Sequence, residues 1–311
     1  MLNVEVHATS HVGRIRKGNE DNYLVLRISD GQKWTSRQEA GEQNIESQNF
    51  EVDEQGVVLA VSDGMGGALA GEVASKMAVE TVGEAMLEED PDKTVSPESF
   101  GDTLVGRLYD SIVYANHKIH QKGREPEFQG MGATFTGVGI TNGAVDLVQI
   151  GDSRTYLIRN AKIYQVTKDQ SLVQQLIDSG QISPEEAETH ALKNVILQAL
   201  GAQNEIYPVA ARLVPQRGDI LIICSDGLSN KIDGIDMQKI VFENIEDLDN
   251  AAAELIRIAN ERGGEDNITL IIARLSGSSL EEPTEDEIRL EAISPENIHD
   301  TAEQDTAEII D

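Results

Sequence analysis

Five aspartates in the sequence stand where an apolar run ends or a tight turn begins, a position from which a carboxylate can reach a metal ion. Hard divalent cations take oxygen ligands, and Mg²⁺ binds a few carboxylates while keeping several waters. One Asp-Gly pair is ordinarily a turn, but five such segments after apolar strands predict a shared divalent-metal site. The segments are Gly18-Asn19-Glu20-Asp21, Ser62-Asp63-Gly64-Met65-Gly66-Gly67, Gly151-Asp152-Ser153-Arg154, Ser225-Asp226-Gly227 and Gly264-Glu265-Asp266-Asn267.

Short strands bounded by turn residues must position these segments. Residues 57–61 form a continuous apolar run that leads into Ser62-Asp63-Gly64, which is typical of a buried strand that opens into a turn. Asn142-Gly143 predicts a hairpin between strands 134–140 and 144–150, because Asn and Gly both tolerate positive φ. Asn160-Ala161 predicts a second hairpin, between strands 155–159 and 162–166, and residues 220–224 and 268–274 complete the predicted strands.

Helical periodicity appears in residues 71–88, 98–121 and 248–262. Because hairpins dominate and long helices separate them, we expect an α+β sandwich of antiparallel sheets covered by helices rather than a wound sheet of βαβ units. Residues 171–200 are also predicted to be helical and lie between two groups of strands, which indicates an inserted flap.

One domain is expected over residues 1–275, with a long surface insertion at about 29–55. The insertion is rich in Gln, Glu, Asn and Ser and holds the only tryptophan, Trp34, which favours a substrate- or partner-facing role. Residues 276–311 contain 12 Asp or Glu and a single basic residue, Arg289. Such a segment buries too little apolar surface to offset its ordering entropy, so we expect a disordered acidic tail, in which 288–293 could form a short helix on a partner.

The net charge is −30, from 55 acidic and 25 basic residues. It argues against nucleic acid or an anionic membrane as a partner, since both polyanions would be repelled. The single cysteine, Cys224, lies in an apolar run and is predicted to be a core residue with no disulfide. Residues 1–5 lack the apolar segment of a signal peptide and no run approaches membrane-spanning length, so we expect a cytoplasmic protein. We also expect a monomer.

Taken in order, the motifs resemble those of the bacterial branch of the protein phosphatase 2C family over nearly all of residues 1–275. The resemblance implies two packed antiparallel sheets flanked by helices, a four-layer α/β/β/α sandwich with a binuclear Mn²⁺/Mg²⁺ centre at one end. It also implies hydrolysis of phosphoserine and phosphothreonine in proteins. The motifs are Arg16-x-x-x-Glu20-Asp21, Asp63-Gly64-Met65-Gly66-Gly67, Gly132-Ala133-Thr134, Gly151-Asp152-Ser153-Arg154, Ser225-Asp226-Gly227-Leu228 and Asp266-Asn267-Ile268-Thr269.

The same resemblance implies how two tight ions are held. Asp63 would bridge both metals, and the Gly64 carbonyl would bind one of them. Asp226 and Asp266 would complete one metal site. Two cations roughly 3.5–4 Å apart can share a bridging water, lower its pKa and aim it at phosphorus, so no protein nucleophile and no phosphoenzyme are expected.

Four further roles follow from the resemblance. Asp21, helped by Glu20, would order water at the other tight metal. Asp152 would contribute to a third, weaker metal site. Arg16 would grip the substrate phosphate, which suits a guanidinium because its planar fork can donate two parallel hydrogen bonds to phosphoryl oxygens. The expected partners are phosphoprotein substrates, together with a cognate serine/threonine kinase or its targets.

Two positions depart from the family pattern. A histidine often follows the Gly-Gly of the second motif, and this sequence has Ala68 there. A phrase that usually ends in Asp-His is Asp169-Gln170 here. Leaving-group protonation is therefore expected to fall to water rather than to a histidine, and the pH optimum is expected to be higher than in a histidine-assisted member. Neither change removes a metal ligand.

Two other functions fit parts of the pattern. A catalytically weak phosphatase-like module could bind phosphoproteins or a kinase without turnover, but such a module usually lacks an aspartate that is present here. A Ca²⁺-stabilised adhesive domain is disfavoured because the carboxylates are too dispersed for an EF-hand loop. The sequence does not decide whether Arg154 makes a structural ion pair or has a functional role.

Overall fold

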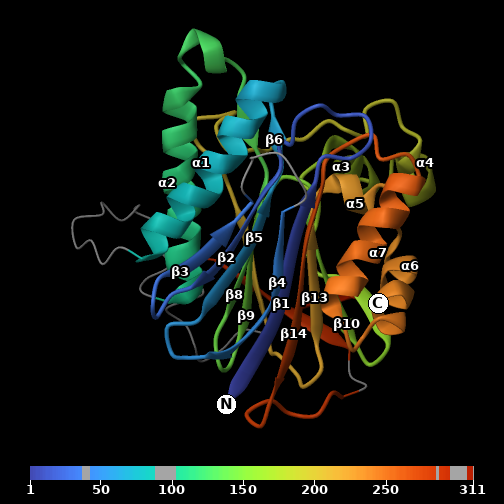
Figure 1. The fold of residues 1–311 in the computed structure, drawn as a ribbon. Helices are drawn as coiled ribbons and strands as arrows, with labels where there is room; N and C mark the ends of the chain where they lie inside the picture. Colours follow the sequence, from blue (N-terminus) through green and yellow to red (C-terminus); the bar gives the residue numbers. More distant parts are fainter. Residues whose placement is uncertain (37–42, 88–102, 285–286, 295–306, 311) are drawn as a thin grey trace.

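Two antiparallel β-sheets pack face to face and carry helices on their outer faces, which gives four layers (Figure 1). The computed structural model describes residues 1–36, 43–87, 103–284, 287–294 and 307–310. The α/β/β/α sandwich implied by the sequence is confirmed.

The first sheet has six strands in the order β11-β10-β13-β14-β1-β4. Its neighbouring strands β1 and β14 pair antiparallel from Leu2 opposite Gly277 to His11 opposite Ile268. The start of the chain and the end of the predicted domain therefore lie side by side. The strands are β1 (Leu2–His11), β4 (Gln43–Val52), β10 (Arg154–Arg159), β11 (Lys162–Gln165), β13 (Ile220–Cys224) and β14 (Ile268–Gly277).

The second sheet has eight strands in the order β16-β15-β12-β9-β8-β5-β2-β3. A separate two-stranded ribbon, β6 (Gly64–Met65) with β7 (Gly132–Ala133), follows β5 at one end of the sandwich. The strands of the large sheet are β2 (Asn22–Arg27), β3 (Gln32–Thr35), β5 (Val57–Ser62), β8 (Phe135–Ile140), β9 (Val145–Ile150), β12 (Val209–Leu213), β15 (Ile288–Ile293) and β16 (Ala307–Ile310).

Helices cover the outer face of each sheet (Figure 1). The helices α1 (Ala68–Leu87) and α2 (Leu104–Lys122) pack on the eight-stranded sheet, and α5 (Asp226–Ser229), α6 (Gly234–Glu243) and α7 (Leu248–Glu261) pack on the six-stranded sheet. A short 3₁₀ helix spans Pro126–Phe128. The predicted helix 71–88 is confirmed up to residue 87, the last one described there; 248–262 is confirmed, and so is the part of 98–121 from residue 104 onward. Residues 98–102 lie outside the described residues.

Strand β5 illustrates why the strands are continuously apolar. Leu59 and Val61 belong to the core between the two sheets, whereas Val58 and Ala60 belong to the core under α1 and α2. Successive side chains of a strand point to opposite faces, so a strand buried on both faces needs an apolar residue at every position. The run 57–61 is therefore explained by its place in the middle of four layers.

Both predicted hairpins form, but the turn at Asn142-Gly143 has a different backbone conformation from the one expected. Asn160 and Ala161 have φ of 49° and 57°, as a two-residue turn between twisted strands requires. The turn at Asn142-Gly143 contains no positive φ and is closed by the Thr141 N–H, which donates to the Ala144 carbonyl at 3.0 Å. The prediction of positive φ there was wrong, because a four-residue connection can turn without it.

The predicted surface insertion at 29–55 is mostly sheet in the described residues. Strand β3 pairs with β2, and β4 pairs with β1 as the edge of the six-stranded sheet. Trp34 stacks on Phe50 with ring centroids 6.4 Å apart, and both pack against the core between the sheets. The expectation of an irregular insertion was wrong because these strands are polar on one face and pair with residues distant in sequence. Residues 37–42 lie outside the described residues.

The disordered tail was predicted to begin at residue 276, but an ordered strand lies beyond that point. Strand β15 pairs with β12 at Ala210 opposite Ile293, and in turn accepts β16 as a neighbour. Ile288 is 1% exposed and Leu290 8%, and both lie in the core between the sheets. Residues 288–293 are thus a strand on this domain, not a helix on a partner. The acidic residues around them made the alternating apolar pattern hard to recognise in the sequence. Residues 295–306 and 311 lie outside the described residues.

The segment 171–200 is only partly helical. It contains two short helices, α3 (Leu172–Asp178) and α4 (Pro184–Glu188), followed by turns. The Leu172 N–H donates to the Val195 carbonyl, which closes the segment on itself, and the Leu200 N–H donates to the Ala133 carbonyl of β7, both at 2.8 Å. None of the helices in the described part of the chain has the length and apolar content needed to span a bilayer.

Candidate metal centre

The strand registers bring the aspartate segments to one end of the sandwich. In the eight-stranded sheet Asn22, the first residue of β2, pairs with Ser62, the last residue of β5. Asp21 precedes the one strand and Asp63 follows the other, so the two aspartates stand at neighbouring strand ends. Asp152 lies in the turn that leaves β9 and enters β10.

The six-stranded sheet presents its aspartates at the corresponding end. Cys224, at the end of β13, pairs with Leu270 near the start of β14. Asp226 therefore begins α5 directly after one strand, and Asp266 stands just before the other. Gly227 allows these turns to approach, because a Cβ there would lie 1.9 Å from the Asn267 carbonyl oxygen.

A hydrogen bond between the sheets joins the two groups. Ser225 donates from its Oγ to an Asp21 carboxylate oxygen at 2.7 Å, and the same Oγ accepts from the Thr269 N–H at 3.0 Å. Asp21 is 1% exposed and Ser225 is fully buried. The first and fourth aspartate segments, about 200 residues apart in sequence, are thus fixed against each other.

Asp63 is held by its backbone. Its N–H donates to the Thr134 hydroxyl at 2.9 Å, and its carbonyl accepts from the Thr134 N–H at 2.8 Å. The next residue, Gly64, donates its N–H to the Glu20 carbonyl at 3.1 Å. A Cβ on Gly64 would lie 2.1 Å from the Gly71 carbonyl oxygen, so only glycine fits between these backbones.

Burial and the neighbouring negative charges raise the pKa of Asp63, Asp21 and Asp152. Burial is the main cause for Asp63, whose pKa is well above its ordinary value, and the negative charges of Asp21, Asp226, Asp152 and Asp266 add to it. Burial also raises the pKa of Asp21 and of Asp152 to about 7 each, with further contributions from Asp226. Electrostatically, Asp63 is the centre of this cluster, because it interacts with all four of the others.

Arg16 lies across the mouth of the cluster. Its Nη2 donates to Asp266 at 2.9 Å and its Nη1 to Glu20 at 3.4 Å, and 45% of the side chain is exposed. Burial is the main cause that raises the pKa of Glu20, while Arg16 opposes that rise. The guanidinium therefore sits beside the carboxylates with part of its surface open to solvent, where an anionic group can reach it.

The donor set fits a hard divalent cation. The site offers aspartate oxygens from several segments, and Asp226 Oδ1 is buried with no hydrogen-bond partner among the described residues. A buried, unpaired carboxylate oxygen is costly unless a cation or a proton meets it. Among the described residues, no three His, Cys, Asp or Glu side chains are grouped closely enough to hold an ion by themselves, which is compatible with an ion that binds few carboxylates and keeps several waters.

Arg154 makes a structural ion pair. Its Nε and Nη2 donate to the Asp169 carboxylate at 2.9 and 2.7 Å, and its Nη1 donates to the Tyr156 hydroxyl at 3.2 Å. The pair anchors the start of β10 directly after Asp152. Of the two roles that the sequence leaves open for Arg154, the structure shows the ion pair.

The two departures from the family pattern differ in what the structure shows. Gln170 accepts the Gly151 N–H at 2.9 Å and donates to the Tyr207 carbonyl at 3.2 Å, so it braces the Asp152 turn. The side chain of Ala68 lies outside what the structure describes. Cys224 is fully buried and burial raises the pKa of its thiol to about 12, so it is unsuited to act as a nucleophile.

Asn267 organises the site, a role that the sequence interpretation missed. Its side-chain oxygen accepts the Glu20 N–H at 2.8 Å, and its amide donates to the Val12 and Gly18 carbonyls at 2.8 and 3.0 Å. It thereby ties the Arg16 loop to the turn that carries Asp266. The only sequence signal was its place beside that aspartate, since hydrogen bonds over about 250 residues leave no local pattern.

Comparison with known proteins finds bacterial serine/threonine phosphatases. Protein phosphatase PhpP of Streptococcus pneumoniae (strain D39) is 38% identical over 226 residues, covering 72% of this chain and 88% of the relative. The crystal structure of the Mycobacterium tuberculosis serine/threonine phosphatase PstP/Ppp matches with a TM-score of 0.69 and 31% identity, covering 88% of this chain and all of that one. A structure of the PstP catalytic domain in complex with two manganese ions matches with a TM-score of 0.68 and 30% identity, over 89% of this chain and all of that one.

The fold and the carboxylate cluster define a metal-dependent phosphatase of proteins phosphorylated on serine and threonine. A family model for protein phosphatase 2C matches residues 35–269, and the chain belongs to this family.

Proposed function

We propose that the five aspartates and Arg16 carry out the hydrolysis of phosphoserine and phosphothreonine in proteins at a binuclear Mn²⁺ or Mg²⁺ centre. The observation that carries this assignment is the position of Asp63, which interacts with four other aspartates from four separate segments. Such a group of like charges, partly or fully buried, is stabilised in its ionised form by cations beside it.

Asp63 would hold both ions, with the Gly64 carbonyl beside it. Asp226 and Asp266 would complete one site, and Asp21 would serve the other, with its oxygen oriented by Ser225. Two such ions, when bound, lower the pKa of water and offset the charge of the phosphoryl group. The protein's part is to fix these oxygens on strand ends and to exclude a competing side-chain nucleophile.

Arg16 would bind the phosphate of the substrate. The guanidinium already spans Glu20 and Asp266, and its exposed surface leaves donors for phosphoryl oxygens. Glu20 would position Arg16 and water rather than bind metal directly. The support is that the pKa of Glu20 is raised mainly by burial, with Arg16 as its nearest counter-charge.

Asp152 is proposed for a third, weaker site. It faces Asp226 and Asp169, whose charges add to the effect of burial on its pKa, and the adjacent Arg154 lowers it. That nearby cation reduces the charge available to an ion, which is a reason for weaker binding. The structural pair between Arg154 and Asp169 would keep this arrangement fixed.

A serine/threonine kinase, or the proteins that it phosphorylates, are the proposed substrates, because phosphoserine and phosphothreonine must first be formed by such an enzyme. The cytoplasmic location and the monomeric state remain predictions. The catalytically weak binding module is not favoured, because the similar proteins are named as phosphatases and all five aspartates are present.

Hydrolysis of p-nitrophenyl phosphate and of a phosphothreonine peptide tests the proposal. Activity should require added Mn²⁺ or Mg²⁺ and should disappear in excess EDTA. Restoring Mn²⁺ should restore it, which separates metal loss from irreversible unfolding. Robust turnover in EDTA would show that the carboxylate cluster is not the catalytic centre.

A further inference from the structure

A short basic stretch stands beside the carboxylate cluster of this strongly acidic protein. Arg14, Ile15, Arg16 and Lys17 follow one another in the loop after β1, and all four are exposed. The protein carries a net charge of −30, so an acidic peptide would be repelled over most of its surface. The basic side chains of this loop could bind the carboxylates of a peptide in spite of the negative potential of the rest of the surface.

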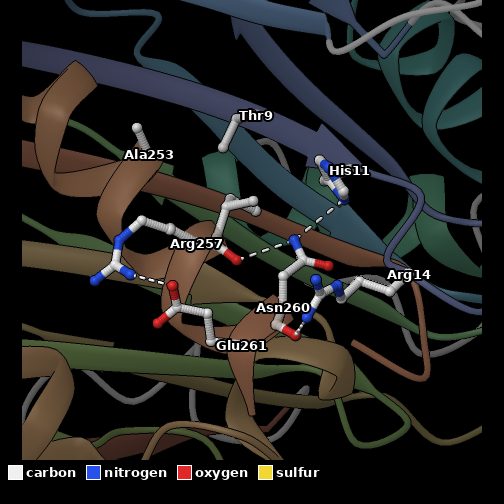
Figure 2. A pocket seen from close by; sticks show the side chains of 8 residues that line it. Thr9, His11, Arg14, Ala253, Arg257, Asn260 and Glu261 are labelled. Carbon is white, nitrogen blue, oxygen red and sulfur yellow. Dashed lines mark hydrogen bonds and ion pairs between the residues drawn. The ribbon is translucent and has the colours of Figure 1, made fainter. Parts of the chain in front are cut away.

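A pocket opens next to this loop, between the end of β1 and the last turns of α7 (Figure 2). Its volume is about 430 Å³, and its lining includes Thr9, His11, Arg14, Arg257, Asn260 and Glu261. It is separate from the aspartate cluster, since none of the five aspartates lines it. The volume is sufficient for one or two side chains of a bound peptide.

Two arginines line the pocket, and they differ in how their charge is used. Arg257 donates to Glu254 and to Glu261 along α7, so its charge is neutralised on its own helix. Among the described residues the side chain of Arg14 makes one hydrogen bond, from Nη1 to the Asn260 carbonyl at 3.3 Å (Figure 2). Among the described residues no carboxylate lies within ion-pair distance of Arg14, so its guanidinium keeps donors for an anion.

The pocket shares its frame with the phosphate-binding region. The backbone N–H groups of Arg14 and Ile15 donate to the Gly264 carbonyl at 2.7 and 3.3 Å, two residues before Asp266. Asp266 in turn accepts from Arg16 at 2.9 Å. A substrate whose phosphate lies at Arg16 would therefore place neighbouring residues of its chain near Arg14.

We propose that this pocket binds the carboxylate of an aspartate or glutamate close in sequence to the phosphorylated residue, so that the enzyme favours phosphosites with acidic neighbours. The proposal rests on the proposed function, because it takes Arg16 as the phosphate site. Ile15, which is 66% exposed between the two arginines, offers an apolar contact for the intervening residue.

The simpler role for Arg14 is to bond the C-terminal carbonyls of α7, as basic side chains often do at helix ends. That role uses one donor and is independent of substrate sequence. The two roles therefore make different predictions about peptides, although both predict some loss of stability when Arg14 is removed.

The test compares phosphothreonine peptides that carry a single aspartate placed in turn at each flanking position, with alanine peptides as reference. We expect one or two positions to raise kcat/KM for the parent protein about threefold to tenfold, the range for a charged hydrogen bond that is partly exposed. Arg14→Ala should bring this ratio close to one, and Arg14→Glu should invert it in favour of lysine at the same position.

Lys162→Ala is the matched control, because it also removes one positive charge but lies at the start of β11, beside the end of β10 that is opposite to Asp152. It should keep the parent's preference. An unchanged preference in Arg14→Ala would overturn the inference, and so would a parent with no preference. If Arg14→Ala only relieves inhibition by inorganic phosphate, the pocket binds a free anion and the proposal is wrong. Failure of the parent to hydrolyse any phosphopeptide would instead reject the proposed function.

Discussion

Ile288→Ala should destabilise the domain, although this residue lies in a stretch whose composition indicates a disordered tail. In the structure Ile288 is 1% exposed and packs in the core between the two sheets. Its strand pairs with β12 on one side and β16 on the other. Alanine would leave a cavity in a region where both sheets contribute side chains, and such a cavity collapses only in part.

The magnitude follows from the burial. Replacing a fully buried isoleucine by alanine costs about 3 kcal/mol in the free energy of unfolding. The unfolding entropy is about 2.1 cal/mol/K per residue, or roughly 0.65 kcal/mol/K for 311 residues. The melting temperature should therefore fall by about 5 °C.

The assay is thermal unfolding followed by circular dichroism at one fixed Mn²⁺ concentration, because bound ligand raises the apparent stability. Arg289→Ala is the control, since Arg289 is exposed on the same strand and its removal should change the free energy by less than about 0.5 kcal/mol. Equal melting temperatures for Ile288→Ala and the parent would refute the packing of β15. A chain ended after Gly277 should melt lower still.

Three further predictions concern the site. Arg16→Ala should raise KM for a phosphopeptide and lower kcat/KM, with Mn²⁺ affinity nearly unchanged. Arg16→Lys should restore only part of kcat/KM, since an ammonium cannot donate two parallel hydrogen bonds. Unchanged kinetics in Arg16→Ala would show that Arg16 has a structural role. Asp152→Ala should raise the Mn²⁺ concentration needed for full activity while calorimetry still detects the tight ions; loss of those ions would contradict a separate third site. In EDTA the protein should melt higher at pH 6 than at pH 8. The reason is that the pKa values of Asp21 and Asp152 are raised to about 7 from an ordinary value near 4, so the folded state binds protons that the unfolded state does not, and stability falls as pH rises through about 7. A higher melting temperature at pH 8 would contradict these shifts.

Local pattern was enough to predict most of the layers. The run 57–61 and the hairpin at Asn160-Ala161 depend on burial and turn chemistry within a few residues, and both formed as predicted. The helix periods of α1 and α7 reflect one buried face each. Sheet order depends on pairing between distant strands, so the contact of β1 with β14 could be inferred only from the family resemblance.

The errors at the tail and at the 29–55 insertion have a common physical cause. Average composition hides strands that bury one face only. In β15 the buried Ile288 and Leu290 alternate with the exposed Arg289 and Glu291, so acidic residues dominate the count while the period of two is present. In β4 the partner β1 lies about 40 residues earlier in the chain, and no local signal specifies that pairing.

The aspartates of the candidate site were predicted from the sequence, but the residues that hold them in place were not. Aspartates at strand ends are visible in sequence, and the registers bring their segments to one end of the sandwich. The Ser225 bond to Asp21 and the three bonds of Asn267 join segments more than 200 residues apart, so their roles became visible only in three dimensions.

Calorimetric titration of Mn²⁺ into the parent protein and Asp63→Asn, at the same pH and after EDTA treatment, tests the central assignment most directly. Asparagine keeps the size of the side chain and the backbone bonds to Thr134 while it removes one charge from the centre of the cluster. The parent should bind two ions tightly, and Asp63→Asn should lose tight binding of both, together with nearly all phosphatase activity. Binding of two Mn²⁺ by Asp63→Asn as tightly as by the parent would contradict it.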